Sequence, residues 1–272
     1  MPRTAKEREV AESFSQQYNL VLADVMMAIE RESCGSDYGS TSWTTMAEAN
    51  RVRQLLDLTP GDRLLDIGSG SGWPGLYLAK TSGCDVVLTD LPLSGLRIAA
   101  ERAMADQHGG ICWTSVADGE ALPFRDASFD AISHSDVLCC LSDKEAALRA
   151  CRNAIRPEGR MVFSVISVAS GLSAAEFETA LAHGPPYIES ENPYAELLEQ
   201  TGWHVVDCID ITEDFVNSVR CMVDAQKANA EQLREFLGDT ETAARMARMK
   251  GRLAAREAGL HLRELYVVTP RM

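Results

Sequence analysis

The stretch at residues 64–75 constrains this chain more than any other. Its sequence is Leu-Leu-Asp-Ile-Gly-Ser-Gly-Ser-Gly-Trp-Pro-Gly, so apolar residues lead into an acid and glycines then follow at every second position. A Pro-Gly pair at 60–61 precedes it, and apolar residues with helical spacing follow it. The order strand, glycine turn, helix brings backbone close to a bound nucleotide in α/β sheets, because glycine has no Cβ and tolerates positive φ. The stretch therefore predicts a site for a nucleotide-type ligand.

Two glycine registers compete within this stretch. Gly70, Gly72 and Gly75 fit the dinucleotide fingerprint G-x-G-x-x-G. Asp66, Gly68, Gly70 and Gly72 fit D-x-G-x-G-x-G, which resembles motif I of the class I S-adenosylmethionine-dependent methyltransferases. A carboxylate at the strand end would repel a pyrophosphate bound at the helix N-terminus, whereas it suits the sulfonium and ammonium of S-adenosylmethionine. We therefore favour the second register, in which Asp66, Gly68 and Gly70 hold the methionine end of the cofactor.

Two further acids extend this resemblance. Asp90 ends the second predicted strand, about twenty residues past the glycines, where a carboxylate can accept both ribose hydroxyls. NAD enzymes share that feature, so it does not separate the two readings. Asp118 follows the third predicted strand, and the resemblance implies that it reaches the adenine amino group while the Gly119 backbone meets the ring. Leu91 is expected to lie against the adenine.

The resemblance also indicates where methyl transfer takes place. The cofactor methyl is expected near the end of the fourth strand, which makes His134 a cofactor-contacting residue and a candidate base, with Asp136 beside it. His183 is a second candidate base. Tyr38 and Trp43 are candidates for a lid over the reactive methyl, and Tyr38 is also a candidate catalytic residue. The alternatives stay open: His134 can serve only in packing, and the two aromatics can simply anchor a loop.

The predicted fold is α/β: a doubly wound, mostly parallel seven-stranded sheet of the Rossmann-like methyltransferase type, with a helical cap. The strand order and an antiparallel last strand come from the resemblance. We expect strands near 64–67, 85–90, 111–115, 128–133, 161–166, 202–209 and 261–268, and helices at 6–30, 42–58, 92–107, 143–156, 173–183, 193–200 and 213–259, the last broken near 238. Residues 1–50 are assigned to an N-terminal helical lid and 51–272 to the methyltransferase domain. Cap insertions are expected around 167–200 and 213–259.

Composition limits the partners. The chain of 272 residues has a formal net charge of −14, which disfavours a nucleic-acid surface. Its eight cysteines form no C-x-x-C pair, and the first residues show no secretion signal, so we expect reduced thiols, no bound metal and a cytoplasmic location. No apolar run reaches membrane-spanning length, so no membrane is expected. The protein is expected to be a monomer or a homodimer.

The functional hypothesis is methyl transfer from S-adenosylmethionine to a small-molecule metabolite, at O, N or C, by in-line displacement that leaves S-adenosylhomocysteine. Such an enzyme mainly supplies proximity, alignment and exclusion of water. A base is needed only if the acceptor must lose a proton. Two alternatives remain. One is an NAD(P)-dependent oxidoreductase, supported by Gly70, Gly72, Gly75 and Asp90; the other is a non-catalytic cofactor-binding subunit.

Overall fold

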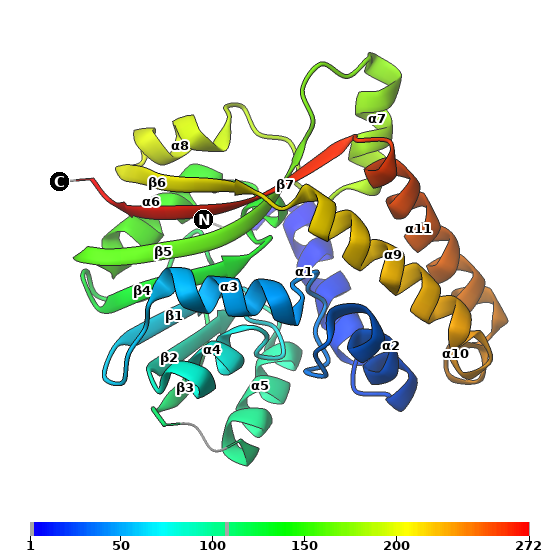
Figure 1. Ribbon diagram of the computed structural model, residues 1–272, viewed down its shortest axis with the longest axis horizontal. Coiled ribbons are helices and arrows are strands. Elements are labelled where there is room, and N and C mark those ends of the chain that lie inside the picture. The colour runs from blue at the N-terminus through cyan, green and yellow to red at the C-terminus, as the bar shows by residue number, and fades with distance from the viewer. Residues whose placement is uncertain (1–2, 107–108, 272) are drawn as a thin grey trace.

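Seven strands form one sheet in the computed structural model, which describes residues 3–106 and 109–271 (Figure 1). The strands are β1 (Arg63–Ile67), β2 (Asp85–Asp90), β3 (Cys112–Val116), β4 (Phe129–Ser135), β5 (Ile155–Val168), β6 (Trp203–Asp210) and β7 (His261–Pro270). Their order is β3-β2-β1-β4-β5-β7-β6, and β7 runs antiparallel to both neighbours. The predicted mostly parallel sheet with an antiparallel last strand is confirmed.

Helices cover both faces of the sheet because each inner strand buries side chains on both sides. The helices are α1 (Ala5–Tyr18), α2 (Asp24–Cys34), α3 (Met46–Leu56), α4 (Gly75–Ser82), α5 (Leu93–Ala105), α6 (Lys144–Ala154), α7 (Ala174–His183), α8 (Tyr194–Gln200), α9 (Thr212–Ala228), α10 (Ala230–Leu237) and α11 (Asp239–Glu257). In β1, Leu64 joins an apolar cluster with α3, α4 and α5, whereas Leu65 joins one with α6 and α8. The fold is therefore doubly wound.

The strand order reverses between β1 and β4, which makes this point of the sheet a topological switch point. The chain moves outward from β1 through β2 to β3, and then returns to place β4 on the other side of β1. The carboxyl ends of these parallel strands meet at one edge of the sheet. Ligands of open α/β sheets bind at such a switch point, so the segments after β1 to β4 are the first place to look for a site.

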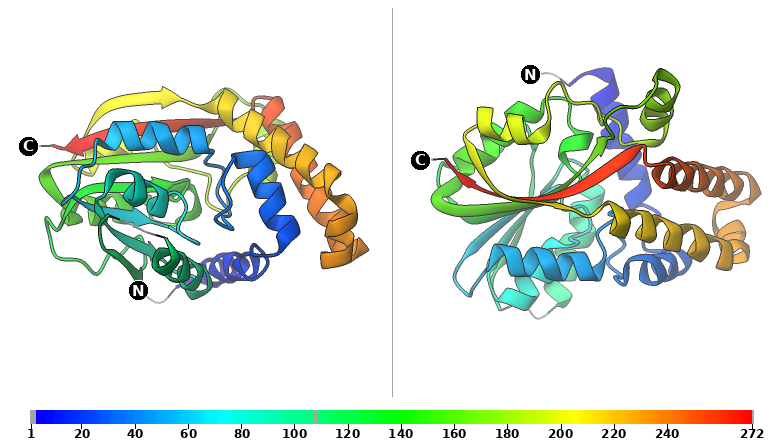
Figure 2. Two further views of the ribbon diagram at one scale, coloured as in Figure 1. Left: turned by 60° about the horizontal axis from the view of Figure 1, so that its bottom comes forward. Right: turned by 45° about the horizontal axis from the view of Figure 1, so that its top comes forward.

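The two predicted caps lie together. Met26 and Ile29 of α2 form a small apolar core with Ala225 of α9 and Leu233 of α10. Figures 1 and 2 show α9, α10 and α11 projecting beyond the sheet, with α2 beside them. The division into a lid at 1–50 and a domain at 51–272 stays a prediction; residues 1, 2 and 272 lie outside the described part of the chain.

Some element boundaries differ from expectation. The predicted helix at 6–30 is two helices, because the chain turns after Tyr18 so that Tyr18 and Val21 can pack on Ile98 of α5. The helical stretch at 213–259 breaks at Asn229 as well as near residue 238. Helical spacing alone cannot locate such turns, because tertiary packing decides them. Residue 107, the expected end of another helix, lies outside the described part.

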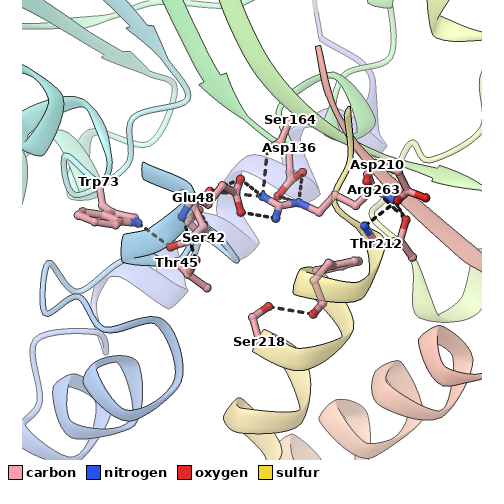
Figure 3. A network of polar contacts seen from close by, with 12 residues as sticks. Ser42, Thr45, Glu48, Trp73, Asp136, Ser164, Asp210, Thr212, Ser218 and Arg263 are labelled. Carbon is pink, nitrogen blue, oxygen red and sulfur yellow. Dashed lines mark hydrogen bonds and ion pairs between the residues drawn. The ribbon is translucent and has the colours of Figure 1, made fainter. Parts of the chain in front are cut away.

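One buried ion cluster joins four elements (Figure 3). Arg263 of β7 is 0% exposed, and its two terminal nitrogens donate to both carboxylate oxygens of Glu48 in α3, at 2.7 and 2.8 Å. Its Nε donates to Asp136 after β4 at 2.9 Å, and one terminal nitrogen also donates to Ser164 of β5 at 3.0 Å. Removing one member of such a cluster leaves charge buried without compensation.

We expect Arg263→Met to lower the free energy of unfolding by about 3–5 kcal/mol, because Glu48 and Asp136 would lose their shared cation. Urea denaturation measures the loss. Arg220→Met is the matched control: Arg220 pairs with Glu257 at 2.8 Å, but both side chains are nearly half exposed, and such a pair contributes about 0–1 kcal/mol. Equal effects of the two substitutions would contradict a structural role for the cluster.

Candidate active site

A cavity of about 460 Å³ opens at the carboxyl edge of the sheet. Its lining comes from Arg3, from α1, from residues 40–43, 66–71, 73–74, 90–92, 117–120, 135–137, 140–142 and 184–187, from Ile166, and from Arg252 and Arg256 of α11. The predicted cofactor residues Asp66, Gly68, Gly70, Asp90, Leu91, Asp118 and Gly119 all line it. Residues from the ends of three strands therefore converge on one cavity, as their positions in the sequence predicted.

The loop after β1 requires glycine. Gly68 and Gly70 have φ of 66° and 52°, in the left-handed region that residues with a Cβ rarely adopt. A Cβ on Gly68 would overlap the side chain of Val137, and one on Gly70 would overlap the ring and hydroxyl of Tyr18. Gly72 lies outside the cavity lining, so the structure gives no support for its predicted contact with the cofactor.

Asp66 lies at the base of the loop and is 1% exposed. Its Oδ1 accepts a hydrogen bond of 2.6 Å from Ser133, whereas its Oδ2 has no hydrogen-bond partner among the described residues. Oδ2 lies beside Gly75, the first residue of α4, so the helix end that would hold a pyrophosphate already faces a carboxylate. Burial raises the pKa of Asp66 to about 7. This geometry favours the D-x-G-x-G-x-G register over the dinucleotide one.

Asp90 closes the loop from the neighbouring strand. Its Oδ2 accepts from the backbone of Gly70 at 2.8 Å and its Oδ1 from the backbone of Leu91 at 2.7 Å. Burial raises the pKa of Asp90 to about 6. Each carboxylate oxygen can accept more than one hydrogen bond, so both remain able to accept ribose hydroxyls.

Asp118 has a competing cation. Arg3 donates to its Oδ2 at 3.3 Å, while Oδ1 accepts from the backbone of Glu120 at 3.1 Å. The side chains of Arg3 and Asp118 are 40% and 28% exposed, so the pair contributes about 0–1 kcal/mol and is readily exchanged. Asp118 can therefore accept from an adenine amino group if Arg3 moves aside.

The N-terminal segment supplies one wall of the cavity. Tyr18 of α1 is buried beside Gly70, and Trp43 faces the cavity from the loop between α2 and α3. Glu30 fixes that loop: its carboxylate accepts from the backbone N–H of Tyr38, Gly39 and Ser40, at 3.2, 2.7 and 3.1 Å. The lid position predicted for Trp43 fits this geometry.

The three predicted catalytic residues do not line the cavity. Tyr38 packs on Trp73 with ring centroids 5.2 Å apart, so it anchors the loop and does not face a reactive methyl. His183, at the end of α7, packs under Gly251 of α11. The structure thus corrects the expected positions of Tyr38 and His183.

His134 is also placed differently from expectation. Its ring is 3% exposed, stacks on Phe163 with centroids 4.5 Å apart, and has no hydrogen-bond partner for either nitrogen among the described residues. Burial lowers its pKa to about 3, so it is uncharged at neutral pH. The reason is that β4 continues to Ser135, so His134 lies inside the strand, on the opposite face of the sheet from Asp66, and its ring packs on Phe163 of β5.

Other residues reach the cavity instead. Asp136 has a φ of 56°, unusual for a residue with a Cβ, and Arg263 holds its carboxylate at the cavity wall. Arg252 and Arg256 enter from α11, more than one hundred residues later in the chain. No motif marked Tyr18, Arg252 or Arg256. The signal for Tyr18 was helical spacing, and that for the two arginines was the basic second half of the last predicted helix, which fits either a solvated face or contact with an anionic acceptor or partner.

Residues 65–163 match the family described as "Methyltransferase domain". The match includes Asp66, Asp90 and Asp118, the residues on which the resemblance to the class I S-adenosylmethionine-dependent methyltransferases rests. The chain is 29% identical over 185 residues to a phosphoethanolamine N-methyltransferase of Triticum aestivum, which covers 67% of this chain but only 36% of that relative. It is 26% identical over 220 residues to the methyltransferase GfsG of Streptomyces halstedii, with 77% of each protein covered.

A solved structure has the same fold as this chain. It is phosphoethanolamine N-methyltransferase 2 of Haemonchus contortus, in complex with phosphomonomethylethanolamine and S-adenosylhomocysteine. The two superpose with a TM-score of 0.83 at 16% identity, covering all of this chain and 62% of that one. The similarity shows the fold, which the predicted Rossmann-like methyltransferase class describes correctly.

The residues present in the cavity fit the family's cofactor. Gly68 and Gly70 bring the loop backbone to the cavity lining, and the unpartnered Asp66 oxygen and the half-buried Asp90 offer carboxylates to a ligand that carries positive charge and hydroxyl donors. Among the described residues, no group of three or more His, Cys, Asp or Glu side chains lies close enough together to hold a metal ion. The expectation that the protein uses no metal stays a prediction.

The raised pKa of Asp66 predicts a pH dependence of stability in the ligand-free protein. Because its folded pKa of about 7 lies above the ordinary value of 3.8, the folded state keeps a proton that the unfolded state releases between about pH 4 and pH 7. Stability contributed by that proton is therefore lost as the pH rises through this window, on the order of 4 kcal/mol.

Asp66→Asn should reduce this dependence, since the amide does not titrate, and should leave the part that the raised pKa of Asp90 contributes. Urea denaturation at several pH values between 4 and 8 measures the slope. Asp126→Asn, at an exposed position before β4, is the control and should keep the wild-type slope. A slope in Asp66→Asn equal to that of the wild type would contradict the assignment.

Proposed function

We propose that this protein transfers a methyl group from S-adenosylmethionine to a small-molecule acceptor in the cavity, by in-line displacement. One observation carries the proposal: the glycine loop, Asp90 and Asp118, from three separate segments, line a single cavity that also extends to the cap helices. The wheat and Streptomyces relatives are named as methyltransferases, but the wheat protein is much longer than this chain, so activity and substrate are proposals here.

The chain's own residues would bind, orient and exclude water. S-adenosylmethionine supplies an activated methyl group with a good leaving group. Asp90 would accept the ribose hydroxyls and Asp118 the adenine amino group, while the backbone of Gly68 and Gly70 would lie along the methionine end. Tyr18 and Trp43 would cover the cavity, so that water is excluded and the acceptor is held in line.

Proton transfer has few candidates in this cavity. No histidine is among the residues that line it in the described chain, so the acceptor would react with little help from a base. Asp136 is the carboxylate beside β4, and it accepts hydrogen bonds of 2.9 and 3.1 Å from Nε of Arg263. An amine that is nucleophilic at neutral pH, or an acidic hydroxyl, fits such a site best.

The proposal extends to the setting in which the protein works. We infer a cytoplasmic enzyme, a monomer or homodimer, with neither nucleic acid nor membrane as partner. The net charge of −14 supports the exclusion of a polyanion. No helix in the described part of the chain is both long and apolar enough to cross a membrane.

Cofactor choice is tested first by calorimetric titration of the purified protein with S-adenosylhomocysteine, and with NAD and NADP in parallel. We expect S-adenosylhomocysteine to bind with a micromolar dissociation constant and the two dinucleotides not to bind, because Asp66 faces the start of α4. Binding of NAD or NADP alone would support the oxidoreductase alternative and would overturn the roles given to Asp66 and Asp118.

Asp90→Ala should weaken S-adenosylhomocysteine binding at least tenfold, since it removes the ribose acceptor and the hydrogen bond that holds Gly70. Turnover at saturating cofactor should fall less, because Asp90 does not touch the transferred methyl. Asp85→Ala is the control: Asp85 begins the same strand, at the opposite edge of the sheet. Unchanged cofactor affinity in Asp90→Ala would sink the ribose assignment.

A further inference from the structure

One face of α11 carries positive charge toward the interior. Arg245, Met249, Arg252 and Arg256 follow one another at steps of four, three and four residues, which places them in a single stripe along the helix. Arg256 is 3% exposed and Arg252 is half-buried, and both line the cavity. Arg245 belongs to the same stripe but lies outside the cavity lining.

The two cavity arginines have no carboxylate partner among the described residues. Arg256 makes one hydrogen bond, from Nη1 to the backbone oxygen of Arg252 at 2.9 Å, and its Nε is buried without a partner. Exposed arginines nearby are paired, as Arg248 is with Glu241 at 2.7 Å. Buried charge without a partner is costly, so a fold that keeps it inward normally uses it.

Aromatic rings hold the Arg256 guanidinium in place. Its central carbon lies 4.6 Å from the ring centre of Phe215 and 5.4 Å from that of Trp43. Such stacking fixes the plane of the guanidinium and leaves its edge for a ligand. Burial lowers the pKa of Arg256 to about 9, so the side chain is still charged at neutral pH.

The strand order separates this positive end from the cofactor residues. Asp118, Asp90 and Asp66 follow β3, β2 and β1, whereas Ile166, which also lines the cavity, is in β5. From β3 to β5 is four strand spacings, or roughly 19 Å. The chain runs from α11 into β7, the strand next to β5, so the arginines lie at the end of the cavity away from the ribose and adenine residues.

We propose that the methyl acceptor is a small anion, carrying a carboxylate or a phosphate, and that Arg252 and Arg256 bind this group. The inference rests on the proposed methyltransferase function and names the class of its acceptor. A guanidinium donates two parallel hydrogen bonds to either group, so both chemistries fit the same pair of residues. The nearest carboxylate that acts on Arg256 is that of Asp136, which is already paired with Arg263, so the anion would be the direct partner that the two arginines lack.

Calorimetry on the purified protein saturated with S-adenosylhomocysteine tests this proposal. Inorganic phosphate and acetate are titrated separately, at constant ionic strength set with chloride. We expect saturable binding of at least one of them in the millimolar range or tighter, and the stronger one identifies the group. Arg252→Gln and Arg256→Gln should each weaken it at least tenfold, and Arg248→Gln, which removes an exposed and paired charge from the same helix, should leave it within twofold.

The affinity for S-adenosylhomocysteine separates the outcomes. We expect it to stay within twofold in every variant, which also shows that each is folded; Arg252→Gln, at the half-buried position, covers the case in which Arg256→Gln fails to fold. A loss of cofactor affinity in either folded variant would mean that the arginines bind the methionine carboxylate, and would overturn the proposal. So would the absence of saturable anion binding. If the wild type does not bind S-adenosylhomocysteine, the proposed function fails, and the same anion titrations on the free protein still decide whether the arginines form an anion site.

Discussion

The buried guanidinium of Arg263 connects segments that lie far apart in the sequence. It binds Glu48 near the N-terminus, Asp136 after β4 and Ser164 in β5, and it lies on the antiparallel strand that closes the sheet. A desolvated charge of this kind is stable only when every partner is in place, so the cluster fixes where those elements stand relative to one another. The left-handed backbone of Asp136 is one result, and the position of α11, which leads into the same strand, is another.

The cofactor half of the site could be predicted because, in parallel strands, a residue that ends a strand in the sequence also lies at the carboxyl edge of the sheet. Asp66, Asp90 and Asp118 each lie in or next to a predicted strand end, and the carboxyl ends of parallel strands share one edge of the sheet. The glycine loop was predictable for a local reason, since Gly68 and Gly70 need a backbone conformation that other residues avoid. Neither inference required knowledge of packing.

The acceptor half depends on information that no short stretch of sequence contains. The predicted strand ended before His134, the position where a catalytic residue is expected, but β4 continues to Ser135 and His134 lies inside it, on the face away from Asp66. Tyr38 lies in the loop whose backbone N–H groups donate hydrogen bonds to Glu30, because a buried carboxylate needs hydrogen-bond donors. Tyr18, Arg252 and Arg256 come from helices whose orientation is set by long-range contacts. Helical spacing therefore did not predict which part of the molecule these side chains contact.

The charges of the cavity connect its two halves. Asp66 and Asp90 lie at the cofactor end, where burial raises the pKa of Asp66 to about 7 and that of Asp90 to about 6. Arg252 and Arg256 lie at the other end, where the Asp136 carboxylate is already paired with Arg263. Each end is therefore unfavourable in the free protein: the acids are held partly protonated, and the arginines are desolvated without a counter-ion. A cationic cofactor would provide a counter-charge for the acids, and an anionic acceptor would provide one for the arginines. The removal of these two unfavourable contributions would add to the binding free energy of the ligands. By linkage, ligands that bind only the folded protein also stabilise it, so the same unmet charges that weaken the empty fold favour the complex in which both ligands are aligned.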